Sequence, residues 1–437
     1  MKRVSKKFFS IVLTMVMAFS VTACGRTKGD ADKMGVQVKQ PAETTKEETA
    51  DMQGTQNTQD GQGSTESKSE EINAAQIEED TGSFKIGMLA DLGRKGKETG
   101  EELKNGAELA VEEINAAGGI GGRMIEFQAK DSKRSDAAAE KAYEGLKEWG
   151  AQMLVGGMDE TETQRFADLT SGDNMFLMLP ASSFFDGTYY SNVYQLELSG
   201  KTQGKMMADY IEKKRLADRV AVIYNSEDVY SLNTYQEFSN EAEFKNFEIC
   251  SAMPYGEGAG STREALEAAE AAGAELLILP VDGEETLKLL KQAAKMDYHP
   301  LCLGSTQTSD LLTKENVDFS ICEGLMFFNS YLPNSTGYMD TAIADFEAAY
   351  EEKYGQKPDV HAAEGYDSIY ALKFAAERSG VLSTMDAQTI CTQFVENMSA
   401  VEMNGLTGTD MKWGTDGSVE KAFKVIQIEN GTVVVKE

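Results

Sequence analysis

The chain has 437 residues and a formal net charge of −30 at pH 7, because 72 acidic residues outnumber 42 basic ones. A surface of this charge repels nucleic acid and anionic lipid, so the composition disfavours a nucleic-acid partner. The length is sufficient for two α/β domains of ordinary size beyond a non-globular N-terminal part.

The N-terminus has the pattern of an export signal. Four basic residues within the first seven precede an apolar run over 8–21, which is shorter than the roughly 20 residues that span a bilayer. This favours a cleaved signal peptide at 1–23 over a transmembrane helix. The following Val21-Thr22-Ala23-Cys24 is similar to a bacterial lipoprotein cleavage box, which implies that Cys24 carries a palmitate-type lipid anchor. The alternative is an ordinary signal peptide with a chance cysteine.

Residues 24–83 are rich in Gln, Thr, Glu, Asp, Gly and Ser and nearly free of aromatic residues. Such a segment cannot bury enough surface to offset its ordering entropy. We therefore predict a lipidated, disordered tether here, although a specific binding tail is a second interpretation.

The globular part begins with a βαβ unit over 84–131. Apolar Phe84, Ile86 and Met88 precede a loop with three glycines, and apolar residues then recur at the helical spacing of three and four until the glycines of 118–122. The loop that follows such a strand is where open α/β sheets bind ligands, so residues 92–100 are a candidate binding loop.

The same alternation continues through the chain and predicts parallel sheets. We expect further strands at 152–156, 175–179, 193–198, 219–224, 248–253, 275–280, 301–304 and 325–329. We expect further helices at 137–149, 162–171, 202–213, 232–244, 261–272, 284–296, 341–353 and 361–379. A C-terminal hairpin is expected over 422–435, with its turn at Glu429-Asn430-Gly431.

Several segments together resemble one family. GAELAVEEINAAGGIGGRMIEF, EGYDSIYALKFAAERSG and NGLTGTDMKWGTDGSVEKAFKVIQIENG are similar to segments of the branched-chain amino-acid (Leu/Ile/Val-binding-like) extracytoplasmic solute-binding lipoproteins of ABC importers. The resemblance implies a type I periplasmic-binding-protein fold, an α/β fold of two doubly wound parallel-sheet lobes joined by three hinge crossings. We expect the crossings near Ser199, Ser330 and Asn404. Lobe 1 is then 84–199 with 331–403, and lobe 2 is 200–330 with 404–437.

The resemblance also assigns ligand contacts in the first lobe. Ser182 and Ser183 follow a strand at a Pro-small-small-Ser turn, where the family binds the ligand's carboxylate, although they could instead cap a helix. Thr161 lies where the family offers a hydroxyl. Glu160 departs from that pattern, so either it points away or the ligand differs. Arg94 in the first loop could meet an anionic ligand or be solvated.

In the second lobe the expected contacts are Tyr230, Asp282 and Thr306. Tyr230 matches a family turn whose ring covers the ligand, and the alternative is an exposed loop tyrosine. Amino-acid binders of the family place an acidic group near Thr306 to accept the α-ammonium, since a desolvated cation needs a counter-charge. Either Asp282 or Glu160 takes that role here, or the ligand lacks an ammonium group.

Enzyme chemistry has little support in the residues. The two histidines, His299 and His361, show no metal-ligand spacing, and the glycine-rich stretches match neither the phosphate-loop nor the dinucleotide pattern. We expect no cofactor and no metal. Besides Cys24 there are four cysteines, so disulfides are possible in an exported protein. Cys302 with Cys322 is the expected pair, and free buried thiols are the alternative.

Taken together, these features predict an extracytoplasmic receptor and not an enzyme. It would be a monomer that captures a small amino acid, or a related amide or carboxylate, and delivers it to the permease of an ABC importer. The alternative is a sensory or scaffold lipoprotein that signals to another membrane protein.

Overall fold

The computed structural model describes residues 82–93, 97–158, 160–182, 189–256, 258–312, 317–332 and 340–436. The predicted signal peptide, Cys24 and the tether lie outside these ranges, as do Arg94 and Ser183, and the side chain of Glu160 is also outside the description. Among the helices that are described, not one combines the length and the apolar character needed to cross a bilayer.

The first sheet has five parallel strands in the order β2-β1-β3-β4-β5. Its strands are β1 (Phe84–Ala90), β2 (Ile125–Asp131), β3 (Met153–Gly156), β4 (Phe176–Leu179) and β5 (Val193–Gln195). The helices associated with it are α1 (Lys97–Ala116), α2 (Asp136–Trp149), α3 (Glu160–Asp173), α8 (Asp340–Tyr354), α9 (Val360–Ser379) and α10 (Ala387–Asn397). The strand order reverses between β1 and β3, which is where such sheets bind ligands.

Helices α1 and α9 approach each other through two glycines. A Cβ atom on Gly106 would lie 1.8 Å from the carbonyl oxygen of Ala362, and one on Gly365 would lie 2.0 Å from that of Leu103. Because both neighbours are backbone atoms, no larger residue fits without moving a helix. This contact fixes the N-terminal turn of α9, which carries functional side chains described below.

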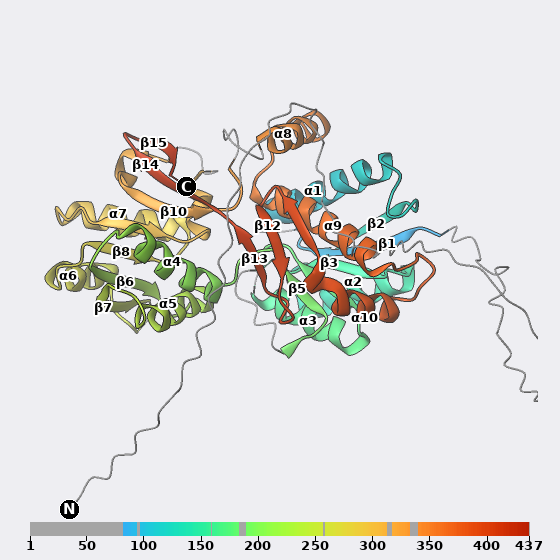
Figure 1. Cartoon of the computed structure of the whole chain (residues 1–437), viewed down its shortest axis with the longest axis horizontal. Helices are drawn as coiled ribbons and strands as arrows, with labels where there is room; N and C mark the ends of the chain where they lie inside the picture. Colours follow the sequence, from blue (N-terminus) through green and yellow to red (C-terminus); the bar gives the residue numbers. More distant parts are fainter. Residues whose placement is uncertain are drawn as a thin grey trace, which may run out of the picture. The chain divides into compact units, whose positions relative to one another are not determined.

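The second sheet has seven strands in the order β15-β14-β10-β9-β8-β6-β7. They are β6 (Arg219–Asn225), β7 (Glu248–Tyr255), β8 (Leu276–Leu279), β9 (Leu301–Gly304), β10 (Leu325–Asn329), β14 (Lys424–Glu429) and β15 (Thr432–Val435). Its helices are α4 (Gly200–Lys214), α5 (Val229–Ala242), α6 (Thr262–Ala271) and α7 (Gly283–Lys295), with short 3₁₀ turns η2 (Gln307–Leu312) and η3 (Phe319–Cys322). The hairpin predicted at 422–435 is present as β14–β15, and its strand β14 pairs antiparallel with β10 and lies beside it in Figure 1.

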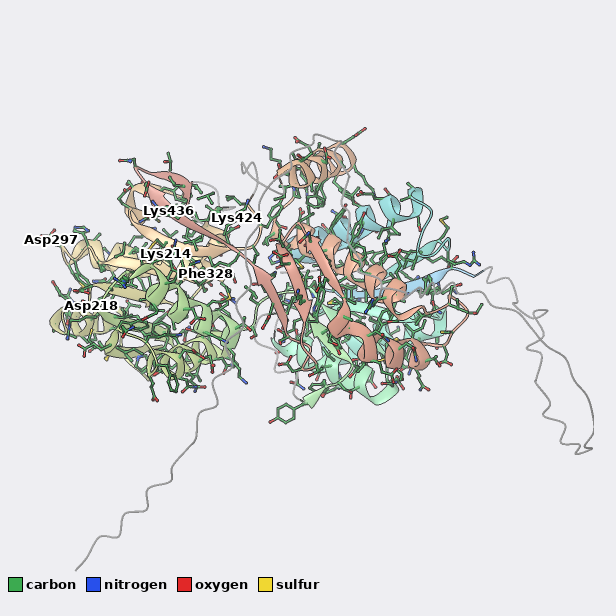
Figure 2. All side chains as sticks on the ribbon, in the orientation of Figure 1. Lys214, Asp218, Asp297, Phe328, Lys424 and Lys436 are labelled. Carbon is green, nitrogen blue, oxygen red and sulfur yellow. The ribbon has the colours of Figure 1, made fainter. Side chains whose placement is uncertain are left out.

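Aromatic packing joins the C-terminal hairpin to the second sheet. The ring of Phe328 on β10 lies 4.6 Å from that of Phe423 and 5.9 Å from that of Tyr210 on α4, measured between ring centroids. Figure 2 shows Phe328 and Lys424 on these adjacent strands, which pair in register at Asn329 and Lys424. The last strands of the chain are therefore part of a core that the preceding βα units begin.

A third, small sheet lies in the sequence between β10 and β14 of the second sheet. It consists of β11 (Glu402–Gly405), β12 (Gly408–Trp413) and β13 (Val419–Ala422), and a 3₁₀ turn η4 (Met398–Ala400) precedes it. Trp413 donates its indole N–H to the carbonyl oxygen of Gln195 at the end of β5, 2.6 Å away. The chain pairs with the second sheet only from Lys424, so the change of sheet comes about twenty residues later than the crossing predicted near Asn404.

The cysteines do not form the expected disulfide. Cys302 and Cys322 lie in one core cluster of the second sheet, but all four described cysteines are free thiols. Burial raises the pKa of Cys302 to about 12 and that of Cys322 to about 11, so both stay protonated and unreactive.

Candidate functional site

The carboxyl ends of β1 and β2 hold a charged turn in a fixed shape. Asp91, which is buried, forms an ion pair with Nε of Arg134 at 3.3 Å. The Asp131 carboxylate accepts the backbone N–H groups of Leu92 and Lys133 at 3.1 and 3.0 Å. A Cβ atom on Gly100, in the first turn of α1, would lie 2.0 Å from the carbonyl oxygen of Asp91, so a larger residue does not fit at this position without a shift of the backbone. The predicted binding loop is thus anchored on both sides, although Arg94 itself is not described.

Two buried hydroxyl groups lie near the ends of β3 and β4. Ser182 and Thr163 are fully buried, and neither side-chain oxygen has a hydrogen-bond partner among the described residues. The Thr163 oxygen would lie 2.8 Å from a Cβ atom on Gly157, the residue that follows β3 with a φ of 92°. A buried hydroxyl without a partner costs free energy, so these two groups are suited to a ligand that completes them.

Thr161 lies at the mouth of a neighbouring hollow of about 320 Å³. Its side chain is exposed, and the hollow is lined by Arg134, Ser135, Asp136, Ala139, Thr161, Glu162 and Arg165. One wall is the N-terminal turn of α2, where the Ser135 side chain caps the helix by accepting the N–H of Ala138. Thr161 as a ligand contact stays a prediction. Sequence reasoning did not single out Thr163, because nothing distinguishes it from an ordinary helix residue.

The carboxyl ends of β6 and β8 in the second sheet carry carboxylates. Asp228 caps α5 by accepting the N–H of Tyr230 at 3.0 Å, and Asp282 caps α7 by accepting the N–H of Glu285 at 2.8 Å. Glu285 accepts the hydroxyl of Tyr255 at 2.5 Å and the amide of Asn225 at 3.3 Å. Burial, with contributions from Glu285 and Asp282, raises the pKa of Asp228. Within the described ranges, none of these three carboxylates forms an ion pair.

The sequence left two interpretations of Tyr230, a ring that covers the ligand or an exposed loop tyrosine. The structure excludes the exposed tyrosine. Tyr230 lies in the first turn of α5, is 1% exposed, and its hydroxyl has no hydrogen-bond partner of standard geometry in the described structure. Its backbone packs against the start of α4, where a Cβ atom on Gly200 would lie 2.9 Å from the Tyr230 carbonyl oxygen. Ser305 after β9 is also fully buried with an unpartnered hydroxyl.

Thr306 is part of a buried polar network that ties several segments together. Its hydroxyl accepts the amide of Gln203 on α4 at 2.7 Å and donates to Glu197 at 2.9 Å. Its backbone N–H donates to the same Gln203 side chain at 2.9 Å. The second oxygen of Glu197 lies 3.3 Å from the ammonium group of Lys421 on β13, whose side chain is fully buried. Glu197 follows β5, so the network includes the segment that connects the first sheet to the second.

A second charged pair lies at the N-terminus of α9. Nδ1 of His361 is 2.9 Å from a carboxylate oxygen of Glu364. Burial opposes a charged imidazole, but the hydrogen bond to Glu364 and the charges of Glu364, Asp359 and Glu197 outweigh it and raise the pKa of His361 to about 9. Burial raises the pKa of Glu364. His361 is therefore an imidazolium at neutral pH, and the Glu197 network lies within its electrostatic reach.

The Tyr-Asp motif of the same helix has a structural role. Asp367 accepts the backbone N–H groups of Leu406 and Thr407, at 2.9 and 2.7 Å, and the hydroxyl of Thr407 at 2.7 Å. The hydroxyl of Tyr366 donates to Glu113 on α1 at 2.5 Å. These contacts join the third sheet to α9 and α9 to α1, so the motif stabilises the scaffold.

Sequence reasoning missed Glu197, Gln203 and Lys421. A signal for Glu197 was available, because it is a lone acidic residue between Leu196 and Leu198 in an otherwise buried run. Lys421 is one of the alternating residues of a C-terminal strand, where its burial depends on packing from distant segments. Gln203 is indistinguishable in sequence from a surface glutamine of a helix.

Comparison with known proteins shows consistent similarity. Residues 83–432 match the family described as periplasmic binding protein. The Leu/Ile/Val-binding protein homolog 3 of Brucella melitensis is 29% identical over 142 residues, which are 32% of this chain and 39% of that relative. The matched segment thus spans well under half of the relative's length.

Two solved structures illustrate the range of ligands among similar proteins. The branched-chain amino acid transporter substrate-binding protein of Streptococcus pneumoniae, solved with isoleucine, has a TM-score of 0.63 and 21% identity, over 81% of this chain and 100% of its own. A solute-binding protein of an ABC transporter from R. palustris, solved with benzoate, has a TM-score of 0.60 and 18% identity, over 81% and 95%. At such identities the likeness establishes the fold alone.

Proposed function

The chain belongs to the periplasmic binding protein family and has its type I fold of two doubly wound lobes, and from this premise we propose that it is an extracytoplasmic receptor for a small amino acid. A related amide or carboxylate is the wider ligand class. The receptor delivers its ligand to an ABC importer and catalyses no reaction.

The proposal is supported by one observation: the two sheets carry different polar groups at the ends of their strands. The first sheet offers unpartnered buried hydroxyls at Ser182 and Thr163, and Arg134 lines the hollow that also includes Thr161. The second offers carboxylates at Asp228 and Asp282. An amino acid carries one charge of each sign a few ångströms apart, so it complements both.

In this proposal the first lobe binds the ligand's carboxylate. Hydroxyl O–H groups donate to a carboxylate, and hydrogen bonds to an ionised partner are about twice as strong as neutral ones. Ser182 and Thr163 supply these donors, and Ser183, Thr161 and Arg94 complete the same end of the ligand. Tyr230, Asp282, Thr306 and the segments around them close over the other end.

Binding and delivery follow from hinge bending between the lobes, because each lobe supplies part of the ligand's shell. The first two crossings are proposed near Ser199 and Ser330, and the third at 422–424, where β13 ends and β14 begins. The closed form then presents the surface that a membrane permease recognises. Cys24 anchors the monomeric receptor to the membrane through its lipid, and the segment to residue 83 acts as the tether.

The test is to purify the exported protein and identify its ligand. Mass spectrometry of small molecules released on denaturation, followed by a thermal-shift series with the twenty amino acids and simple amides and carboxylates, gives the answer. A ligand at a hundred times its Kd stabilises the protein by about 2.7 kcal/mol, which a melting curve resolves. A shift with at least one amino acid supports the proposal, and no shift across the series contradicts it in favour of a sensory or scaffold lipoprotein.

A further inference from the structure

Two segments that connect the sheets are joined by a buried ion pair. Glu197 lies two residues after β5 of the first sheet and three residues before α4, which packs in a core cluster of the second. Lys421 lies on β13, three residues before β14 of the second sheet begins, and Figure 1 shows the chain running from β13 into β14. Nζ of Lys421 is 3.3 Å from Oε2 of Glu197, and the lysine side chain is fully buried. One ion pair therefore holds both connecting segments together.

The third sheet, which carries Lys421, is fixed to the first sheet. Trp413 donates its indole N–H to the carbonyl oxygen of Gln195 at 2.6 Å, and the N–H of Gln195 donates to the carbonyl oxygen of Gly417 at 2.8 Å. A Cβ atom on Gly417 would lie 2.2 Å from the carbonyl oxygen of Val193, so the turn between β12 and β13 lies directly against β5. The ammonium group of Lys421 is thus held from the side of the first sheet.

The other carboxylate oxygen of Glu197 is held from the second sheet. Oε1 accepts the hydroxyl of Thr306, which lies two residues after β9, at 2.9 Å. Gln203 on α4 fixes this threonine by donating its amide to the hydroxyl at 2.7 Å and accepting the backbone N–H at 2.9 Å. Glu197 is 7% exposed and Gln203 is fully buried, so solvent has little access to these hydrogen bonds. The two oxygens of one carboxylate are therefore held from different sheets.

We propose that Glu197 is the centre of an interlobe bridge, which favours one arrangement of the two lobes and breaks when the hinge bends. The bridge consists of Glu197, Lys421, Thr306 and Gln203, and it rests on the hinge bending of the proposed function. Rotation of the second lobe moves Thr306 relative to Lys421, and one carboxylate cannot follow both. The contact with Thr306 is the one that breaks, because the carboxylate then keeps its ion pair, whereas separating a buried ion pair leaves two charges uncompensated.

The effect expected of such a bridge is on geometry more than on stability. A buried ion pair contributes little net stability, because the cost of removing both charges from water offsets their attraction. It does disfavour any arrangement in which a buried charge loses its partner or its hydrogen-bond donors. Removing part of the bridge therefore changes which arrangement of the lobes is populated, while the fold of each lobe is retained.

The test measures distances between spin labels on the two lobes of the exported protein in its ligand-free form. Nitroxide labels are attached at Ser171→Cys on α3 and Gln236→Cys on α5, because both residues are exposed. Cys250→Ser removes the one partly exposed thiol among the four cysteines described, and the proposed lipid occupies the thiol of Cys24. With the bridge intact, we expect the main distance to match the described structure.

Two variants break the bridge, and a third is their matched control. Thr306→Val removes the hydroxyl that donates to Glu197, and Lys421→Met removes the charge but keeps an unbranched side chain. Each lowers the population at the main distance, relative to the other distances, by about tenfold or more, the scale for a lost hydrogen bond to a charged group. Thr308→Val is the control, because Thr308 is also buried after β9 but donates its hydroxyl to the carbonyl oxygen of Val281 at 3.0 Å, within the second lobe. The control keeps the wild-type distances.

Melting curves and circular dichroism check that each variant folds, and if Lys421→Met does not fold, Thr306→Val and its control decide. A changed distance distribution in the bridge variants that is absent from Thr308→Val supports the bridge. An unchanged distribution in either folded bridge variant, or an equal change in Thr308→Val, overturns it. Because the measurement uses no ligand, the bridge can fail while amino-acid binding holds, and amino-acid binding can fail while the bridge holds.

Discussion

The strand ends of the two parallel sheets are built alike and charged differently. Each sheet reverses its strand order at one point, between β1 and β3 in the first and between β6 and β8 in the second. At the first reversal lie neutral hydroxyls and an Asp91–Arg134 ion pair, whereas at the second lie Asp228, Asp282 and Glu285 without an ion pair in the part of the chain described.

Two sheets of the same topology can thus bind the two oppositely charged ends of one small molecule. Strand order and helix placement decide where side chains meet, but the residue types at the first three positions after each strand decide the sign of the charge there. A ligand with both charges is then oriented by the pair of lobes. A ligand with only a carboxylate would engage the first lobe alone.

We call the strand ends of the first sheet the first edge and those of the second sheet the second edge. The largest expected effect on binding comes from placing a carboxylate at the first edge, like those at the second. Ser182→Glu places a carboxylate where we propose that the ligand's carboxylate binds, so like-charge repulsion and lost donors weaken amino-acid binding by about 3 kcal/mol or more. Titration calorimetry measures the loss. Ser171→Glu is the matched control, because Ser171 is exposed at the end of α3, and it leaves affinity unchanged. Normal affinity in folded Ser182→Glu would remove the first edge from the site.

Removing a single hydrogen-bond donor from the first edge is expected to weaken binding less than Ser182→Glu does. Ser183→Ala and Thr163→Val each weaken binding by about 1 to 3 kcal/mol, the scale for a lost partner of a charged group. Because the Thr163 hydroxyl has no hydrogen-bond partner among the described residues, Thr163→Val also leaves the melting temperature of the ligand-free protein unchanged or raises it. An equal dissociation constant for wild type and variant would exclude that residue from the ligand shell.

His361, at the N-terminus of α9, makes the free energy of unfolding depend on pH. The pKa of His361 is raised to about 9, so its stabilising contribution is complete below its ordinary value of about 6.5 and is lost as the pH rises through 9. The unfolding free energy of the wild type therefore falls by about 1 kcal/mol between pH 7 and 9.5, on the scale of a partly exposed ion pair. His361→Gln shows a smaller fall in denaturant titrations at the two pH values; an identical fall would assign the effect to other groups.

The smallest effect is expected at the second edge. Asp228 has a raised pKa, caused first by burial and then by Glu285 and Asp282, so its ionisation destabilises the fold as the pH rises above about 4. Asp228→Asn keeps the helix cap and removes the repulsion, which stabilises the protein by about 0.5 kcal/mol at pH 7 and by less at pH 4. A variant that is less stable than the wild type at pH 7 would contradict an unrelieved acidic edge.

Much of the fold followed from local patterns. The alternation of apolar runs with helical periods located the strands from β1 to β10 and the helices between them, and the Asn430-Gly431 turn marked the last hairpin, because these signals depend on neighbouring residues only. The third sheet was missed. Residues 402–422 are stabilised by Asp367 and by the end of β5, contacts that no local pattern contains.

The site was harder to predict for the same reason. Positions directly after strands, such as Ser182 and Thr306, could be inferred because strand ends meet at one edge of a sheet. Glu197 and Lys421 are more than 200 residues apart and form an ion pair only once the third sheet is in place. A pairing of this kind depends on the tertiary fold, so the sequence alone could not predict it.

The most direct test is a crystal structure of the protein with the amino acid that binds it. The account predicts that the ligand's carboxylate lies within hydrogen-bond distance of the Ser182 and Thr163 hydroxyls, and that its ammonium nitrogen faces the Asp228 and Asp282 carboxylates of the second lobe. A ligand bound in the reverse orientation, or bound without contact to either edge, would contradict it.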